Sequence, residues 1–186
     1  MKIGCAVLAG GKSSRMGQDK ALLAYNGNNF IQILCNVLSS FEERIIARGS
    51  RSELPLTDWI MIPDVYPDKG PLGGLHAVLS ACESDAIFFV SCDMPLLQKS
   101  LVDYLCSFMD EEVDAVISVT NDGWKHPLCG VYKKSVVPLA EEQIESGRYS
   151  LMALLDKLRV KCVNLDTSFS SQLANINTLE DYGLLL

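Results

Sequence analysis

A short apolar run that ends in two glycines opens this chain and does most to constrain its fold. Cys5, Ala6, Val7 and Leu8 are apolar, and a Gly-Gly pair closes the run two residues later. An apolar run bounded by breaker residues is typical of a strand buried in a parallel sheet. Ligands of open α/β sheets bind at the carboxyl edge of such strands, where glycines let backbone N–H groups approach an anion. We therefore expect an anion-binding loop directly after this strand.

The same loop carries positive charge. Lys12, Arg15 and Lys20 lie within the stretch from Leu8 to Lys20, which reads LAGGKSSRMGQDK. A Walker loop needs Gly-Lys-Ser/Thr after a glycine at fixed spacing, and a Rossmann fingerprint needs G-x-G-x-x-G, so the stretch fits neither motif. Glycines and cations together are nevertheless suited to a triphosphate, and we interpret the loop as a triphosphate site of another kind.

Strands and helices alternate along the whole chain. We predict strands at 5–8, 44–47, 59–62, 86–91, 113–119, 128–132 and 160–165, and helices at 30–41, 72–82, 101–109, 136–144, 151–158 and 179–184. This alternation predicts a mainly parallel, Rossmann-like sheet with helices on both faces, a three-layer α/β/α fold. With 186 residues, 48% of them hydrophobic, and no linker or internal repeat, we expect a single domain over residues 1–186.

Composition also limits the partners. A net charge of −7 argues against nucleic acid, whose nonspecific binding needs Lys and Arg on phosphates. Residues 1–4 enter the first strand without a secretory hydrophobic segment, and no apolar run is long enough to span a bilayer, so we expect a cytoplasmic protein with no membrane partner. The seven cysteines show no C-x-x-C spacing, and we expect reduced core residues rather than a zinc site.

A carboxylate follows the most apolar predicted strand. Residues 86–91 run directly into Cys92-Asp93-Met94-Pro95, which brings Asp93 to the same edge as the glycine loop. Magnesium prefers oxygen ligands and is typically held by one or two carboxylates plus substrate phosphates. We therefore expect Asp93 to bind Mg²⁺, although an aspartate that caps a turn is the alternative for this residue taken alone.

These motifs resemble one enzyme family. The patterns LAGG-x-S-x-RMG-x-DK and Cys92-Asp93-Met94-Pro95 are similar to those of nucleotidyltransferases that move an NMP from an NTP to a phosphorylated acceptor. Within that group the chain resembles the molybdenum cofactor guanylyltransferases, from Ile3 to Asp181. The resemblance implies transfer of GMP from GTP to the terminal phosphate of molybdenum-molybdopterin, with Mg²⁺ as cofactor. Proteins that insert molybdenum or accept the finished cofactor would be further partners.

The resemblance also implies roles for individual residues. Asp93 would hold the metal, while Arg15 and Lys20 would be catalytic cations beside the α-phosphate and the departing pyrophosphate. His126 and Arg148 would belong to the half of the site that takes the pterin, and the pair Asn175 and Asn177 would lie near the metal and phosphates. Taken alone, His126 could instead be a packed or capped strand residue, and Asn177-Thr178 could cap the last helix. Arg48 stands where the family has an asparagine. The full set of predicted binding residues is Leu8, Ala9, Gly10, Gly11, Lys20, Arg48, Asp64, Gly73, Gly74, Asp93, His126, Arg148, Asn175 and Asn177.

Leu8-Ala9-Gly10 favours GTP as the donor. The family's cytidylyl relatives tend toward an alanine at the third position, whereas glycine leaves backbone groups open to the larger guanine. Three alternatives remain: a relative that uses CTP, one with a sugar phosphate acceptor, and a noncatalytic module that binds GTP. The aspartates Asp64 and Asp93 argue against the last, because anion binding alone gives no reason to place carboxylates beside a triphosphate.

Overall fold

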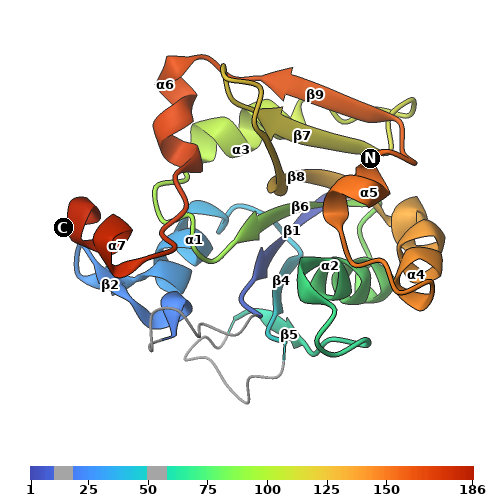
Figure 1. Ribbon diagram of the computed structural model, residues 1–186, viewed down its shortest axis with the longest axis horizontal. Helices are drawn as coiled ribbons and strands as arrows, with labels where there is room; N and C mark the ends of the chain where they lie inside the picture. The colour runs from blue at the N-terminus through green and yellow to red at the C-terminus, as the bar shows by residue number, and fades with distance from the viewer. Residues whose placement is uncertain (11–18, 50–57) are drawn as a thin grey trace.

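A seven-stranded sheet forms the centre of the molecule (Figure 1). The computed structural model describes residues 1–10, 19–49 and 58–186, and within them the strand order is β5-β4-β1-β6-β8-β7-β9. Every neighbouring pair is parallel except that β8 runs antiparallel to β6 and β7. The mainly parallel sheet predicted from the sequence is thus confirmed. The strands are β1 (Ile3–Leu8), β4 (Arg44–Ala47), β5 (Ile60–Ile62), β6 (Ala86–Ser91), β7 (Ala115–Val119), β8 (Lys125–Lys133) and β9 (Val160–Asn164).

Helices cover both faces of this sheet. Side chains of β1 alternate between the two faces: Cys5 and Val7 join the apolar cluster under α1 and α3, whereas Ala6 and Leu8 join the cluster under α2, α4 and α5. The three-layer α/β/α architecture is therefore confirmed. The helices are α1 (Phe30–Val37), α2 (Gly70–Ala81), α3 (Lys99–Cys106), α4 (Val137–Glu145), α5 (Leu151–Leu155), α6 (Thr167–Ser170) and α7 (Leu179–Leu185), with short 3₁₀ helices η1 (Lys20–Leu22), η2 (Lys134–Val136) and η3 (Ser171–Leu173).

The antiparallel direction of β8 comes from a tight turn. Gly123, with φ of +83°, donates its N–H to Thr120 O over 2.8 Å, and Thr120 N–H donates to Trp124 O over 3.0 Å. So short a connection returns the chain beside β7, because a parallel neighbour needs a crossover of a dozen residues or more. The strand starts at Lys125, three residues before the predicted range, and the other predicted boundaries differ from the observed ones by up to four residues.

A small hairpin that the sequence analysis did not predict lies before α1. β2 (Ala24–Tyr25) and β3 (Asn28–Asn29) are joined by Asn26 and Gly27, with φ of +49° and +80°. Two positive φ values in an Asn-Gly turn are the signature of a type I′ hairpin. The C-terminal helix packs on this hairpin: the Tyr182 hydroxyl donates to Ala24 O over 2.6 Å. The hairpin therefore brings α7 close to Lys20, which lies just before it.

Most of the cysteines are core residues, as the sequence predicts. All seven lie in the described residues as thiols, and most are buried in the two large apolar clusters. Cys106 is partly buried against the first of these clusters, and Cys162 is exposed on the edge strand β9. In the described residues, no helix has the length and apolar character needed to cross a membrane.

Candidate active site

The carboxyl ends of β1, β4 and β6 meet at one edge of the sheet. Cys92 N–H, just after β6, donates to Leu8 O over 3.1 Å, and Ala9 and Gly10 N–H both donate to Ala47 O, over 2.9 and 3.1 Å. These hydrogen bonds extend the parallel pairing past the regular strands. They fix the segment Leu8–Gly10 as the floor of the predicted site.

Lys20, Asp93 and Asn177 form a cluster at this edge. Lys20 Nζ donates to Asn177 Oδ1 over 2.7 Å and lies 3.8 Å from Asp93 Oδ2. The side chains of Lys20 and Asp93 are only 17% and 18% exposed, so water screens this ion pair less than it would on an open surface. The structure thus brings together three predicted site residues from distant parts of the sequence.

Local structure holds each member of the cluster. Asp93 follows β6 in a turn closed by Met94 N–H, which donates to Ser91 O over 3.2 Å. Lys20 opens η1, whose N-cap Asp19 accepts from Ala21 N–H over 3.0 Å, so Lys20 begins a capped helical turn rather than lying in an open loop. The segment that carries Asn177 is tied to Asp93 itself, because Ile176 N–H donates to Asp93 O over 2.9 Å.

The carboxylate of Asp93 has the chemistry that a magnesium ion needs. Its Oδ1 atom is buried and accepts no hydrogen bond within the part of the chain that the structure describes. A buried carboxylate oxygen without a donor is costly unless a ligand or ion completes it. Magnesium is typically held by one or two carboxylates together with substrate phosphates, so a single carboxylate is a suitable ligand. The described residues contain no group of three or more His, Cys, Asp or Glu able to enclose a metal. Asp93 therefore fits Mg²⁺.

A second group of predicted residues packs beside this cluster. A Cβ placed on Gly10 would lie 3.2 Å from Gly49 Cα, and one on Gly74 would lie 3.8 Å from Asp64 Oδ1. A Cβ placed on Gly49 would likewise lie 3.8 Å from Asp64 Oδ2, so the Asp64 carboxylate lies between Gly49 and Gly74. Burial, together with the charge of Asp68, raises the pKa of Asp64. The glycines let the ends of β1 and β4 approach the start of α2.

The other predicted binding residues are placed as follows. Gly73 is buried in the first turn of α2, where a Cβ would lie 2.9 Å from Tyr66 O. Arg48 follows β4, is partly buried, and donates its backbone N–H to Ile62 O over 3.1 Å. Asn175 is exposed two residues before Asn177. Gly11 and Arg15 lie outside the described residues.

The two residues predicted for the pterin lie farther along the chain. Within the described ranges, neither His126 nor Arg148 makes a hydrogen bond or ion pair with the Lys20–Asp93–Asn177 cluster. Burial in β8 lowers the pKa of His126, and the charge of Asp122 offsets only part of this effect. The lowered pKa favours a neutral imidazole at pH 7. Arg148 is exposed in the turn after α4, and its neighbour Tyr149 accepts a hydrogen bond of 3.0 Å from Lys69 Nζ at the start of α2.

Comparison with known proteins identifies the family. Residues 5–162 match the profile of the MobA-like NTP transferase domain. The chain belongs to this family. It is thus a nucleotidyltransferase, in agreement with the resemblance seen in its motifs.

Individual relatives match over nearly the full chain. A probable molybdenum cofactor guanylyltransferase of Flavobacterium johnsoniae is 33% identical over 175 residues, covering 94% of this chain and 92% of that protein. A molybdenum cofactor guanylyltransferase of Vibrio atlanticus is 35% identical over 182 residues, covering 94% and 91%. The crystal structure of molybdopterin-guanine dinucleotide biosynthesis protein A from Archaeoglobus fulgidus superposes with a TM-score of 0.83 at 23% identity, covering 100% and 96%, and shows the same fold.

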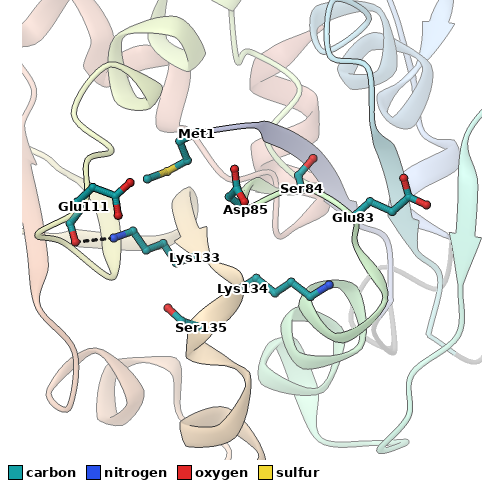
Figure 2. A pocket seen from close by; sticks show the side chains of 8 residues that line it. All are labelled: Met1, Glu83, Ser84, Asp85, Glu111, Lys133, Lys134 and Ser135. Atoms are coloured by element: carbon teal, nitrogen blue, oxygen red, sulfur yellow. Dashed lines mark hydrogen bonds between the residues drawn. The ribbon is translucent and has the colours of Figure 1, made fainter.

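A hollow of about 470 Å³ lies at the opposite edge of the transferase sheet (Figure 2). It lies where β1 and β6 begin, away from the carboxyl ends that carry the predicted residues. Lys133 Nζ donates to Glu111 O over 2.8 Å, and Lys134 Nζ donates to Cys82 O, so both lysines already bond to backbone carbonyls. The residues predicted for the active site lie at the other edge of the sheet. The hollow is lined by Met1, Glu83, Ser84, Asp85, Glu111, Lys133, Lys134 and Ser135.

Sequence reasoning missed one residue that bonds to the Asn177 backbone. Asp181 Oδ2 accepts the backbone N–H groups of Asn177 and Thr178, both over 2.9 Å. The signal was present, because Thr178-Leu179-Glu180-Asp181 has the spacing of a helix capping box with an acidic third residue. Its contact with Asn177, the residue before the N-cap, is not part of the capping-box pattern.

Proposed function

We propose that the chain transfers GMP from GTP to the terminal phosphate of molybdenum-molybdopterin, giving the guanine dinucleotide form of the cofactor and pyrophosphate. The observation that carries this proposal is the Lys20–Asp93–Asn177 cluster, which joins a cation and a carboxylate at the ligand-binding edge of the sheet. The relatives from Flavobacterium johnsoniae and Vibrio atlanticus bear the names of enzymes with this activity. Their similarity over nine tenths of the chain supports the same substrates here.

The chemistry needs charge and alignment rather than a covalent intermediate. An acceptor that is a phosphate monoester is already ionised near neutral pH, so its oxygen needs no general base. The protein has to hold that oxygen in line with the α-phosphorus and to offset the crowded negative charge. Lys20 supplies one cation, and we assign the same role to Arg15.

Asp93 is the residue we assign to magnesium. A bound Mg²⁺ would neutralise phosphate oxygens as charge develops on the departing pyrophosphate. The protein's own part is to hold the Asp93 carboxylate beside Lys20 and to present its buried Oδ1 atom at the site. Asn177 orients the Lys20 ammonium through the 2.7 Å hydrogen bond.

Carbonyl oxygens are the groups we assign to the guanine. The N–H groups of Ala9 and Gly10 are both bonded to Ala47 O, so the carbonyls are the backbone groups that these two residues can offer a base. Carbonyls accept from the N–H groups of guanine. A substitution at Gly10 would also press on the Gly49 backbone, so its effect on base selection would be mixed with an effect on stability.

The pterin side of the site and the compartment belong to the same proposal. We assign His126 and Arg148 to the acceptor, with the Lys69–Tyr149 contact joining the Arg148 turn to the first turn of α2. Proteins that insert molybdenum or receive the cofactor would be the partners that supply and take up the pterin. The cysteines are all thiols, which fits the reducing cytoplasm.

The test is an assay with both nucleotides. The protein is incubated with Mg²⁺, molybdenum-molybdopterin and either GTP or CTP, and pyrophosphate and the dinucleotide product are measured. We expect kcat/KM for GTP to exceed that for CTP by about a hundredfold, because groups that read guanine lose partners beside cytosine. Equal use of CTP would contradict the guanine assignment. Binding of GTP without any pyrophosphate would instead favour the noncatalytic alternative.

A further inference from the structure

The C-terminal segment reaches the active site although it lies outside the region matched by the family profile. That match ends at residue 162, yet Ile176 N–H bonds to Asp93 O over 2.9 Å and the Ile176 side chain is buried against Leu23 and Phe30. The backbone on either side of Asn177 is therefore held between the catalytic edge and α7. Whatever fixes this backbone also fixes the group that meets Lys20.

The carboxylate of Asp181 binds this backbone more extensively than an ordinary helix cap requires. In a capping box, the third helical residue accepts the N–H of the N-cap, here Thr178, and the N-cap side chain accepts in return. Thr178 Oγ1 does accept Asp181 N–H, over 3.0 Å. Asp181 Oδ2 takes the Thr178 N–H and also the N–H of Asn177, both over 2.9 Å. The second of these bonds stabilises the position of Asn177 rather than the helix.

Asn177 passes that restraint to the catalytic lysine. Its Oδ1 atom accepts from Lys20 Nζ over 2.7 Å, and the same ammonium lies 3.8 Å from Asp93 Oδ2. A lysine side chain is long and flexible, so its ammonium keeps one position only where fixed acceptors surround it. The Asn177 side chain is such an acceptor while its own backbone stays in place.

We propose that Asp181 is a positioning residue, which fixes the backbone of Asn177 and thereby holds the Lys20 ammonium beside Asp93. The importance of that ammonium for nucleotide phosphates rests on the proposed function, whereas the chain of contacts does not. Hydrogen bonds from Asn177 and Thr178, aided by the charge of Lys20, lower the pKa of the Asp181 carboxyl. The carboxylate is therefore a stable acceptor at neutral pH.

The helix has other anchors, so a change at Asp181 should not detach it. Tyr182 donates its hydroxyl to Ala24 O over 2.6 Å and meets the Phe30 ring edge to face, with centroids 6.1 Å apart. These contacts involve the next residue along α7 and not the cap. Loss of the Asp181 carboxylate is thus expected to loosen Asn177 before it loosens the helix.

The first test compares two halves of the same capping box. Asp181→Ala removes both bonds to Asn177 and Thr178, whereas Thr178→Ala removes only the return bond and leaves Asn177 held. We expect Asp181→Ala to lower kcat by about tenfold, since small displacements of catalytic groups have effects of this size, and Thr178→Ala by less than about twofold, with similar melting temperatures. Asp181→Asn keeps an acceptor oxygen and should recover most of the loss. Equal loss of kcat in the two alanine variants would show that Asp181 acts only through helix stability.

The second test asks whether Asp181 acts through Asn177. The single variants Asp181→Ala and Asn177→Ala are compared with the double variant in kcat for GMP transfer and in affinity for inorganic tripolyphosphate measured by calorimetry. A residue that acts only through another adds nothing once that partner is gone, so we expect the double variant to match Asn177→Ala within about twofold. Multiplicative losses in the double variant would overturn the proposal.

The tripolyphosphate measurement separates this proposal from the proposed function. Binding of this anion reports on Lys20 without a base or an acceptor. If the unmodified protein fails to transfer GMP, the proposed function fails. The comparison of the single and double variants is then still decided by their affinities for tripolyphosphate. Weaker binding in Asp181→Ala that disappears in the Asn177→Ala background supports the positioning role, and unchanged binding in all three variants contradicts it.

Discussion

At the scale of single residues, the buried Oδ1 atom of Asp93 leads to a clear expectation. Asp93→Asn is nearly isosteric but removes the charge, so we expect turnover to fall by at least about a hundredfold while the fold is kept. Pyrophosphate release at saturating Mg²⁺ measures turnover, and thermal unfolding measures whether the fold is kept. Asp103→Asn is the matched control, because Asp103 is an exposed partner of Lys99 on α3. A rate near that of the unmodified protein would remove Asp93 from the metal site.

The candidate site residues were easier to predict than the contacts between them. Asp93 and Lys20 could be predicted because each follows an apolar strand at the carboxyl edge and fits a family motif. The hydrogen bond from Lys20 to Asn177 joins residues 157 positions apart, and it depends on the packing of α7 against the β2–β3 hairpin. Local sequence patterns hold no information on such a distance. Asp181 remained hidden for the same reason, although its capping pattern was visible.

At the scale of elements, periodicity predicts whether a segment is a helix or a strand better than it predicts the direction of a strand in the sheet. The apolar pattern of 128–132 predicted a strand, but the direction of β8 follows from the turn at 120–124, whose Asp122-Gly123 pair was available as a hairpin signal. The Asn26-Gly27 turn carried the same signal before α1. The sequence analysis predicts strands on both sides of the Asp122-Gly123 turn but does not give their relative direction, and it predicts no strand at 24–29. Parallel neighbours are nevertheless the majority, since most strands are followed by a helix.

The link between β7 and the edge strand β9 should depend on pH. Asp114 accepts from Arg159 Nε over 3.1 Å and from Nη2 over 2.7 Å, and these bonds hold the pKa of the Asp114 carboxyl below its ordinary 3.8. A lowered pKa stabilises the fold above that ordinary value, and the contribution is lost as the pH falls through the lower, folded-state value. We expect Asp114→Asn to lower the free energy of unfolding by about 0.5–1 kcal/mol at pH 7.

Urea unfolding at pH 7 and near pH 3 measures this difference. The difference in unfolding free energy between the two proteins should narrow near pH 3, because the contribution is progressively lost below the ordinary pKa of 3.8. It should also shrink at high salt, because the Arg159 side chain is 64% exposed. A gap that is constant across the pH range would assign the effect of the substitution to packing instead of charge.

At the scale of the whole molecule, the two large apolar clusters set which groups can react. Chain length and alternation predicted two helical layers over one sheet, and those layers enclose most of the cysteines. The third, smaller cluster of Leu23, Phe30 and Ile176 was not predicted, because it joins the two ends of the sequence. This small cluster matters for the site, because burial of Ile176 holds the Asn177 segment next to Lys20.

Thiol reactivity tests this enclosure directly. Cys162 is exposed, whereas burial raises the pKa of Cys35, Cys106 and Cys129 to about 12 each, so these thiols hold little thiolate near pH 8. The thiolate is the reactive form. We expect a chromogenic disulfide reagent to titrate one thiol quickly in the folded protein and all seven in urea, and Cys162→Ser to remove the fast one. If any of the remaining thiols reacted fast in Cys162→Ser, one of the helical layers would have to open readily. A closed core exposes its cysteines only through local or global unfolding.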